Sequence, residues 1–256
     1  MKKFSVILVG VFMLLFSAAI AQAEEARLKA NLNFGYFSRY IGGVNGKTFY
    51  DHSVFQQSIK LADTPTGLYF QIWSSYNPKG GINSDFGDEI DYIVGIYRNF
   101  YDGKLGIDMG YAFYNLYDLK NTEGDLDIIY LKVDLPEVYQ IKPYISIKEN
   151  IPRDKDIREG GFMYSLGVKY SFDLPAALTG QTVNMNLLAG GHDGALGKKP
   201  EMISFVRLVI ATTFKIWKFD ITPEVNFQKR LGHEKENGGM TEDKVWYGIN
   251  FSVPLL

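Results

Sequence analysis

Apolar and polar residues alternate along six stretches of the chain. In one of them, Leu105, Ile107 and Met109 alternate with Gly106 and Asp108. A period of two is typical of a β-strand that has one apolar and one polar face. We therefore expect a strand in each stretch, at residues 28–36, 89–99, 105–113, 162–172, 219–228 and 244–253.

Six further stretches have a mixed periodicity and are also candidate strands. They lie at residues 52–62, 68–77, 125–135, 142–150, 181–190 and 202–215. Together the two sets predict about twelve strands, and an even number is typical of single-chain bacterial outer-membrane barrels.

The connections between these strands alternate in length. Short connections such as 63–66 and 101–103 consist of residues that suit tight turns. The longer ones are polar and rich in Gly, Asn and Asp, and they lie at residues 41–50, 77–88, 116–125, 150–160, 190–201 and 231–241. In an outer-membrane barrel, long loops face the outside of the cell and short turns face the periplasm.

The cost of charge in lipid decides which strand face points outward. A Lys or Arg side chain at the bilayer midplane costs about 2–4 kcal/mol, so the apolar faces must meet the lipid and the polar faces must line the lumen. A soluble barrel or sandwich would show the reverse arrangement, but these polar faces carry too little charge for a water-exposed exterior. Aromatic residues near the strand ends suit interfacial girdles. They are Tyr36, Phe37, Tyr40, Trp73, Tyr76, Phe100, Tyr101, Trp217, Phe219, Trp246 and Tyr247. The pattern predicts an all-β, antiparallel, up-and-down transmembrane β-barrel.

The N-terminus has the three zones of a secretory signal peptide. Lys2 and Lys3 precede an apolar run over residues 4–20, and Ala21 and Ala23 give the small-x-small cleavage pattern. The alternative is a retained membrane helix, for which the run is near the lower length limit. We predict cleavage after Ala23, which leaves residues 24–256 as a single barrel domain in the bacterial outer membrane.

Composition narrows the possible classes further. The chain has no cysteine, so neither lipoprotein acylation nor a disulfide is available. No later segment is apolar for long enough to form a membrane helix, and a membrane protein without one must close its sheet into a barrel. The net charge of −2 falls to −4 when Lys2 and Lys3 are removed, which argues against a nucleic-acid partner. The expected partners are outer-membrane lipid, lipopolysaccharide and, during insertion, the barrel-assembly machinery.

Candidate catalytic and metal-binding residues are few. His52, His192 and His233 fall near the external end, where a lipid-modifying enzyme would act, but none accompanies a recognisable serine nucleophile motif. Acidic residues cluster at two places without the spacing of a calcium loop, and we interpret them as a solvated rim. They are Asp85, Asp88, Glu89 and Asp91, and then Glu123, Asp125 and Asp127. We predict no catalytic residue, no metal and no cofactor.

Charged residues on the predicted inner faces are the candidate pore-lining residues. They are Lys29, Arg39, Lys60, Glu89, Asp91, Asp108, Lys169, Arg207, Glu224 and Lys244. Such groups either pair across the lumen and plug it, or line a wet pore. Small inward residues leave room and favour a narrow passive channel, and they include Gly35, Gly95, Gly106, Gly110, Gly167 and Gly248. Because both signs of charge are present, strong anion or cation selectivity is not indicated, and the identity of the solute stays open. The alternative is a plugged interaction barrel whose external loops contact lipopolysaccharide or partner proteins.

The region 33–77 resembles a known family. The segments that carry the resemblance are Ser38–Gly43, Val54–Ser58, Thr66–Phe70 and Ile72–Ser75. They are similar to the proteobacterial family called Gcw_chp, whose members are exported proteins of about this length. The resemblance implies an outer-membrane barrel and no settled activity. At the other end of the chain, we expect the last strand to end near Phe251 or Val253, followed by a short tail.

Overall fold

The computed structural model describes residues 27–43, 46–78, 89–116, 124–154, 160–174, 181–195, 200–231 and 242–255. Among these residues, no helix is long and apolar enough to cross a membrane. The predicted signal peptide, residues 1–23, lies outside the described residues.

Fifteen β-strands account for most of the described chain. They are β1 (Leu28–Phe37), β2 (Tyr40–Ile41), β3 (Thr48–Tyr50), β4 (Val54–Asp63), β5 (Leu68–Tyr76), β6 (Glu89–Phe100), β7 (Leu105–Leu116), β8 (Leu126–Asp134), β9 (Ile141–Pro152), β10 (Gly161–Asp173), β11 (Thr182–His192), β12 (Glu201–Thr212), β13 (Phe214–Ile216), β14 (Phe219–Arg230) and β15 (Lys244–Pro254). Every stretch predicted from the sequence corresponds to one of them, and the last strand ends at Pro254, one residue beyond Val253.

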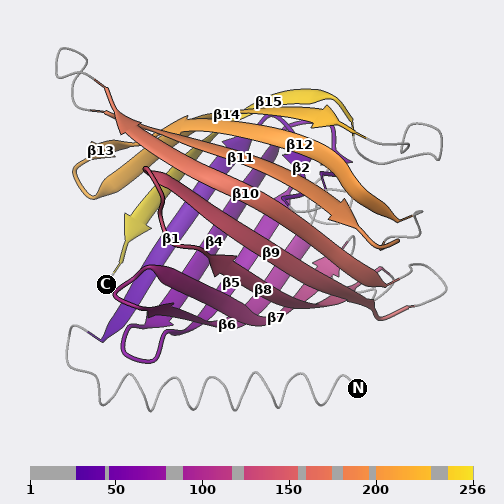
Figure 1. The fold of residues 1–256 in the computed structure, drawn as a ribbon, viewed down its shortest axis with the longest axis horizontal. Helices are drawn as coiled ribbons and strands as arrows, with labels where there is room; N and C mark the ends of the chain where they lie inside the picture. The colour runs from indigo at the N-terminus through magenta and orange to yellow at the C-terminus, as the bar shows by residue number, and fades with distance from the viewer. Residues whose placement is uncertain are drawn as a thin grey trace.

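Twelve of these strands form the wall of a closed antiparallel barrel (Figure 1). Their order is β1-β4-β5-β6-β7-β8-β9-β10-β11-β12-β14-β15, and β15 pairs with β1 to close the ring. β13 follows β12 after Thr213 and pairs with the start of β14. β2 and β3 form a separate two-stranded hairpin. The predicted up-and-down barrel of about twelve strands is confirmed.

Pairing register divides each strand into an inner and an outer face. Tyr69 of β5 contacts Asp108 of β7, with β6 between the two strands, and Tyr130 of β8, with β6 and β7 between. Such contacts between strands that are not neighbours can form only on the concave side, so these residues lie inside. Because successive side chains alternate, the register then assigns every wall residue to one face.

The two ends of the barrel differ as the loop lengths predict. β5 ends at Tyr76 and β6 begins at Glu89, whereas Tyr101–Lys104 alone join β6 to β7. The tight turn uses left-handed backbone at Tyr101, Asp102 and Gly103, with φ of 52°, 56° and 82°. We call the end that carries the longer connections the long-loop end, and the other the turn end.

Four of the aromatic residues assigned to the interfacial girdles lie inside the barrel instead. Trp246 is 4% exposed, and its ring contacts the guanidinium of Arg207 in the lumen. Phe37 and Trp73 share the inner face by register, and Tyr40 belongs to the hairpin. The prediction was wrong for Phe37, Tyr40, Trp73 and Trp246 because it used distance from the strand end, whereas residue parity decides the face.

Candidate functional site

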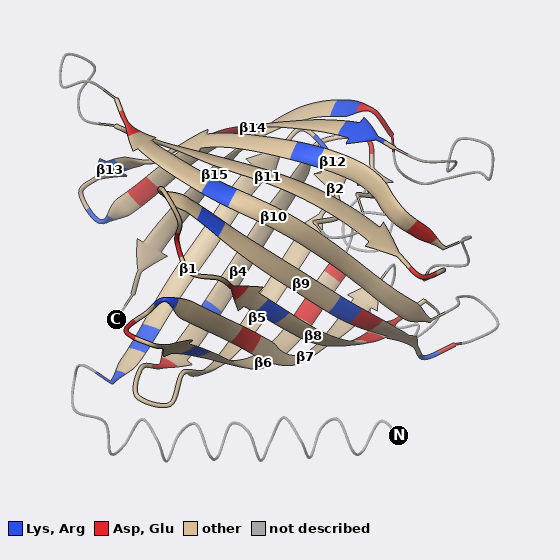
Figure 2. Ribbon diagram, viewed as in Figure 1, with Lys and Arg blue, Asp and Glu red and all other residues tan. Residues whose placement is uncertain are grey.

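The barrel lumen is the candidate functional site, and it contains nine of the ten predicted pore-lining residues. These nine share the inner faces of the wall strands by register: Lys29, Lys60, Glu89, Asp91, Asp108, Lys169, Arg207, Glu224 and Lys244. Figure 2 shows such charges at intervals along the strands, with bands of basic residues side by side on β9 and β10. Their part in permeation stays a prediction.

Arg39 lies at the rim and not on a wall strand. Its Nε is 2.6 Å from Asp51 Oδ1, and its Nη1 donates to the carbonyl oxygen of Val245 at 2.6 Å. Lys244 Nζ lies 3.0 Å from the other oxygen of the Asp51 carboxylate. Partial burial alone would raise the pKa of Asp51, but the hydrogen bonds and charges of Lys244 and Arg39 together lower it below its usual value.

In the middle of the lumen, two tyrosines lie flat against the wall. Tyr69 Oη donates to Asp108 Oδ1 at 2.8 Å and lies 2.5 Å from Tyr130 Oη. Gly95 and Gly110 face each other beneath these rings, and a Cβ at Gly95 would lie under 3 Å from both. The paired glycines therefore keep the tyrosines against the wall and leave the central lumen wider than large residues would.

A second polar cluster lies toward the long-loop end. Lys148 Nζ donates to Tyr114 Oη at 3.1 Å, and Tyr40 Oη donates to Glu89 Oε2. Asp91 is 5% exposed, and its Oδ1 has no hydrogen-bond partner in the described part of the chain. The acidic groups of Glu89 and Asp91 and the ammonium group of Lys148 belong to one largely buried polar cluster.

Basic residues dominate the inner face of β8, β9 and β10 toward the turn end. Lys132 and Lys169 both contact Asp134, at 2.9 and 3.4 Å. Their ammonium groups lie 5.5 and 5.1 Å from the centre of the Tyr144 ring, within the range of cation–π interaction. Lys142 of β9 lies directly opposite Lys169 of β10 in the strand register. Asp134 is thus shared by two lysines, and Lys142 pairs with Glu137, so two carboxylates face three ammonium groups here.

Apolar residues also reach the lumen, near the long-loop end of β7 and β8. Ala112, Leu116, Leu126 and Ile128 form a buried cluster on the inner face. Their packing fills part of the cross-section there, so the lumen is not uniformly polar along its length.

Arg207 connects the wall to the β2–β3 hairpin. Its Nε and Nη2 donate to Gln228 Oε1 at 3.1 and 2.7 Å, and Nη2 also donates to the carbonyl oxygen of Gly42 at 2.7 Å. The guanidinium lies 4.9 Å from the ring centre of Trp246 and 5.2 Å from that of Phe205. Arg207 is only 5% exposed, so it contacts protein on nearly every side.

Several lumen residues were not predicted. Lys132, Lys142, Lys148 and Asp134 belong to strands of mixed periodicity, and the inner faces of those strands had not been assigned. A usable signal exists in 129–134, where Ile, Leu and Val alternate with Tyr130, Lys132 and Asp134.

The candidate histidines lie near the long-loop end where the structure describes them. His192 ends β11, and its Nδ1 accepts the backbone N–H of Gly194 at 3.2 Å. His52 follows β3, with its ring 5.4 Å from that of Tyr50. His233 lies outside the described residues.

The two acidic clusters are only partly described, since Asp85, Asp88 and Glu123 lie outside the described residues. The prediction of a solvated rim is wrong for Glu89, Asp91 and Asp125, which are at most 7% exposed. Asp127 pairs with Arg153 at 2.9 Å, and Asp125 Oδ1 accepts the backbone N–H of Leu116 at 3.0 Å. Among the described residues, no group of three or more His, Asp or Glu side chains is arranged to hold a metal ion.

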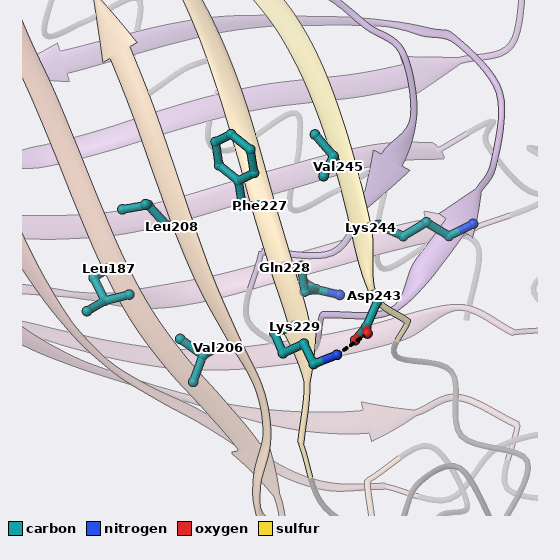
Figure 3. Close-up of a pocket in the computed structure, with 9 residues that line it drawn as sticks. All are labelled: Leu187, Val206, Leu208, Phe227, Gln228, Lys229, Asp243, Lys244 and Val245. Carbon is teal, nitrogen blue, oxygen red and sulfur yellow. Dashed lines mark hydrogen bonds and ion pairs between the residues drawn. The ribbon is translucent and has the colours of Figure 1, made fainter.

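The outer surface carries a shallow apolar groove of about 470 Å³ across β11, β12, β14 and β15 (Figure 3). Leu187, Leu208 and Phe227 contribute to its lining, and Lys229 pairs with Asp243 at its edge. The hydrogen bond from Lys229 lowers the pKa of the exposed Asp243. This groove lies outside the lumen and consists mainly of the apolar face that lipid would cover.

A closed ring of antiparallel strands with an apolar exterior and a charged interior defines the class of transmembrane β-barrels. Solved structures with this fold include the COG4313 outer membrane channel from Pseudomonas putida F1, with a TM-score of 0.58 at 8% identity, covering 91% of this chain and 97% of that one. The KdgM porin in complex with disordered oligogalacturonate has a TM-score of 0.54 at 9% identity, covering 87% and 98%. The barrel fold is therefore that of outer-membrane proteins. No family model matches the chain, and no curated protein matches it.

Proposed function

We propose that this protein is a narrow passive channel for small solutes in the bacterial outer membrane. The observation that carries the proposal is the lumen itself, where polar and charged side chains line a closed barrel whose outer face is apolar. Charged groups occur from Lys29 near the turn end to Glu89 near the long-loop end. A pathway of this kind offers hydrogen bonds to water and to solutes along the membrane normal.

The named structural neighbours support this choice. One is called a channel and the other a porin, and the porin was solved with an oligogalacturonate. Both share the barrel at very low sequence identity, so they support the kind of function and not a particular solute. Lumen charges of both signs, such as Lys60 and Asp108, favour a channel of weak ionic selectivity.

The proposal includes the export of the chain and its orientation in the outer membrane. Residues 1–23 would act as a cleaved signal peptide, and the barrel-assembly machinery would insert the mature chain. The long-loop end would then face outward, toward lipopolysaccharide, and the apolar groove around Leu208 and Phe227 would lie in the lipid. The resemblance to the Gcw_chp family stays a prediction from the sequence.

Conductance of the purified barrel in planar bilayers tests the channel. We expect discrete current steps and a reversal potential close to zero under a salt gradient, because basic and acidic lumen groups are mixed. Heat-unfolded protein from the same preparation is the control for detergent leakage. No current above the lipid baseline would overturn the proposal.

A plugged interaction barrel is the second candidate, and the β2–β3 hairpin inside the lumen favours it. Liposome swelling separates the two functions, because a plugged barrel admits no sugar and a channel admits small ones. A lipid-modifying enzyme is the third candidate, and unchanged lipid turnover after joint replacement of His52, His192 and His233 would remove it.

A further inference from the structure

The β2–β3 hairpin folds into the long-loop end of the barrel, because it contacts inner-face residues of β6, β12 and β14. Figure 1 labels β2 within the outline of the wall strands, near β12. Part of the hairpin is buried although it belongs to a connection at the open end of a barrel: Ile41 of β2 is 8% exposed and Lys47, which precedes β3, is 7% exposed, whereas Tyr40 and the three residues of β3 are partly exposed. Its backbone closes on itself, since Gly42 N–H donates to the Lys47 carbonyl at 2.8 Å. A hairpin that projected freely into water would expose these residues, and side chains of the wall contact this one at Gly42 and Gly46.

The hairpin contacts strands on opposite sides of the ring. Tyr40 donates to Glu89 of β6, and the carbonyl of Gly42 accepts from Arg207 of β12. Five wall strands separate β6 from β12 in either direction, so the two strands are diametrically opposed. A twelve-strand ring with strands about 4.8 Å apart and tilted by about 40° has a backbone diameter of about 24 Å. The hairpin and its partners therefore bridge the whole lumen.

Further contacts fix the hairpin in this position. Gln228 Nε2 donates to the carbonyl oxygen of Gly46 at 2.8 Å, and Asn77 donates to Tyr50 Oη. The Tyr40 ring lies 5.8 Å from that of Trp73. These contacts come from β14, from the end of β5 and from β5 itself, so the hairpin is held from several directions.

Gly46 brings the hairpin close to the wall. Its φ of +65° is a left-handed conformation that other residues adopt only at a cost, and a Cβ there would collide with the ring of Phe205. Phe205 is fully buried, so its ring has little freedom to withdraw. Only glycine permits this approach.

We infer that the β2–β3 hairpin, together with Arg207, forms the narrowest section of the channel and sets its size limit. This inference rests on the proposed function and names the element that determines which solutes pass. The wall alone would admit larger solutes than the hairpin allows, because the backbone ring is wide and glycines thin its inner face near Tyr69 and Tyr130.

A loop-deleted variant tests the inference directly. Phe37 and Val54 pair directly in the β1–β4 register, so a two-residue Asn-Gly turn can replace residues 38–53. We expect its single-channel conductance to rise by about twofold or more, and its liposomes to admit larger sugars, because the ring then sets the limit. Heat-modifiable gel mobility reports whether the variant folds.

Chemical modification provides a second test that leaves the hairpin in place. The chain has no cysteine, and a side chain added at Gly43 meets no other atom within 4 Å. A bulky methanethiosulfonate reagent should therefore attach to Gly43→Cys and reduce its current. Lys104→Cys, in the exposed turn at the other end of the barrel, is the matched control and should keep its current.

The outcomes separate the inference from the proposed function. Equal conductance of the wild-type and loop-deleted proteins, with no block of Gly43→Cys, overturns the inference and leaves the channel intact. A current in the loop-deleted variant alone overturns the open channel and supports the hairpin as the obstruction. If neither the wild-type nor the loop-deleted protein conducts although both are folded, the inference and the proposed channel are both overturned.

Discussion

Arg207 of β12 and Gln228 of β14 face each other across the pairing of their strands, and Gln228 Oε1 accepts hydrogen bonds from both Nε and Nη2 of Arg207. The amide group of Gln228 then donates to the carbonyl oxygens of Gly46 and Glu242 at 2.8 and 3.2 Å. The pair thus links two wall strands, the hairpin and the start of β15 through one set of hydrogen bonds.

Replacement of Arg207 by Met should therefore destabilise the barrel. The guanidinium is buried, and its removal leaves the Gly42 carbonyl and Gln228 Oε1 without a charged donor, a loss of about 1.5–3 kcal/mol. Urea unfolding in detergent micelles measures the free energy of unfolding.

Lys142→Met is the matched control for Arg207→Met. Lys142 pairs with Glu137 at 3.1 Å with both side chains well exposed, so its loss should cost less than about 1 kcal/mol. Equal effects of the two substitutions would show that the Arg207 network contributes nothing beyond an exposed ion pair.

Gly46→Ala should destabilise the protein more than Gly103→Ala. Both glycines have positive φ, at +65° and +82°, so the backbone cost of about 1–2 kcal/mol is shared. Only Gly46 has a neighbour in the way, because the Phe205 ring occupies the Cβ position, whereas Gly103 has open space. Unfolding free energies of the two variants give the difference, and conductance should change for Gly46→Ala alone. Identical behaviour would mean that the hairpin does not press against Phe205.

The alternation of residues along a strand predicts well which side chains face the lumen, provided that one face of the strand is uniformly apolar. Glu89, Asp91 and Asp108 fall inside because their strands alternate cleanly, and pairing cannot slip by one residue without exposing charge to lipid. Parity fails on β8 because Leu126 and Ile128 share the inner face with Lys132, which hides the alternation. Leu126 and Ile128 face inward, where they pack against Ala112 and Leu116 of β7 at the long-loop end. The periodicity within β8 alone does not reveal this contact between strands.

The hairpin could not be predicted from the sequence at all. Gly42 and Arg207 are 165 residues apart, and each looks ordinary in its own segment. Arg207 was predicted to line the lumen. Its hydrogen bond to Gly42 of the hairpin forms only because the barrel closes and places β12 opposite β6. The position of Arg39 also could not be read from alternation, because β1 ends at Phe37, two residues earlier, and its part in lining the pore stays a prediction.

Two adjacent residues of β12 test which face meets lipid. Leu208 lines the outer groove, whereas Val209 pairs with Asn186 and Asn226 on the inner face. Leu208→Lys should cost about 2–4 kcal/mol if that face lies at the midplane of a bilayer. Val209→Lys should cost clearly less, because its ammonium group would enter a polar lumen. Folding titrations in lipid vesicles measure both, and an equal or reversed cost would overturn the assignment of faces.

Asp51 should make the barrel less stable in acid. The basic groups of Arg39 and Lys244 hold the pKa of Asp51 below its usual value, so the folded protein binds a proton there less readily than the unfolded chain. The stabilisation is therefore fully present above the unfolded pKa of about 3.9, and it is lost as the pH falls through the folded value. Since Asp51 is half exposed, the contribution is at most about 1 kcal/mol.

Asp51→Asn isolates this contribution. At pH 7 the variant should unfold at a lower urea concentration than the wild type, and the two should converge as the pH falls through the lowered pKa of Asp51 in the folded protein. Asp102→Asn, in the exposed turn at the other end of the barrel, is the control, and at pH 7 it should unfold close to the wild type. A gap between wild type and Asp51→Asn that persists in acid would show that the carboxylate acts through its shape or its hydrogen bonds, and not through its charge.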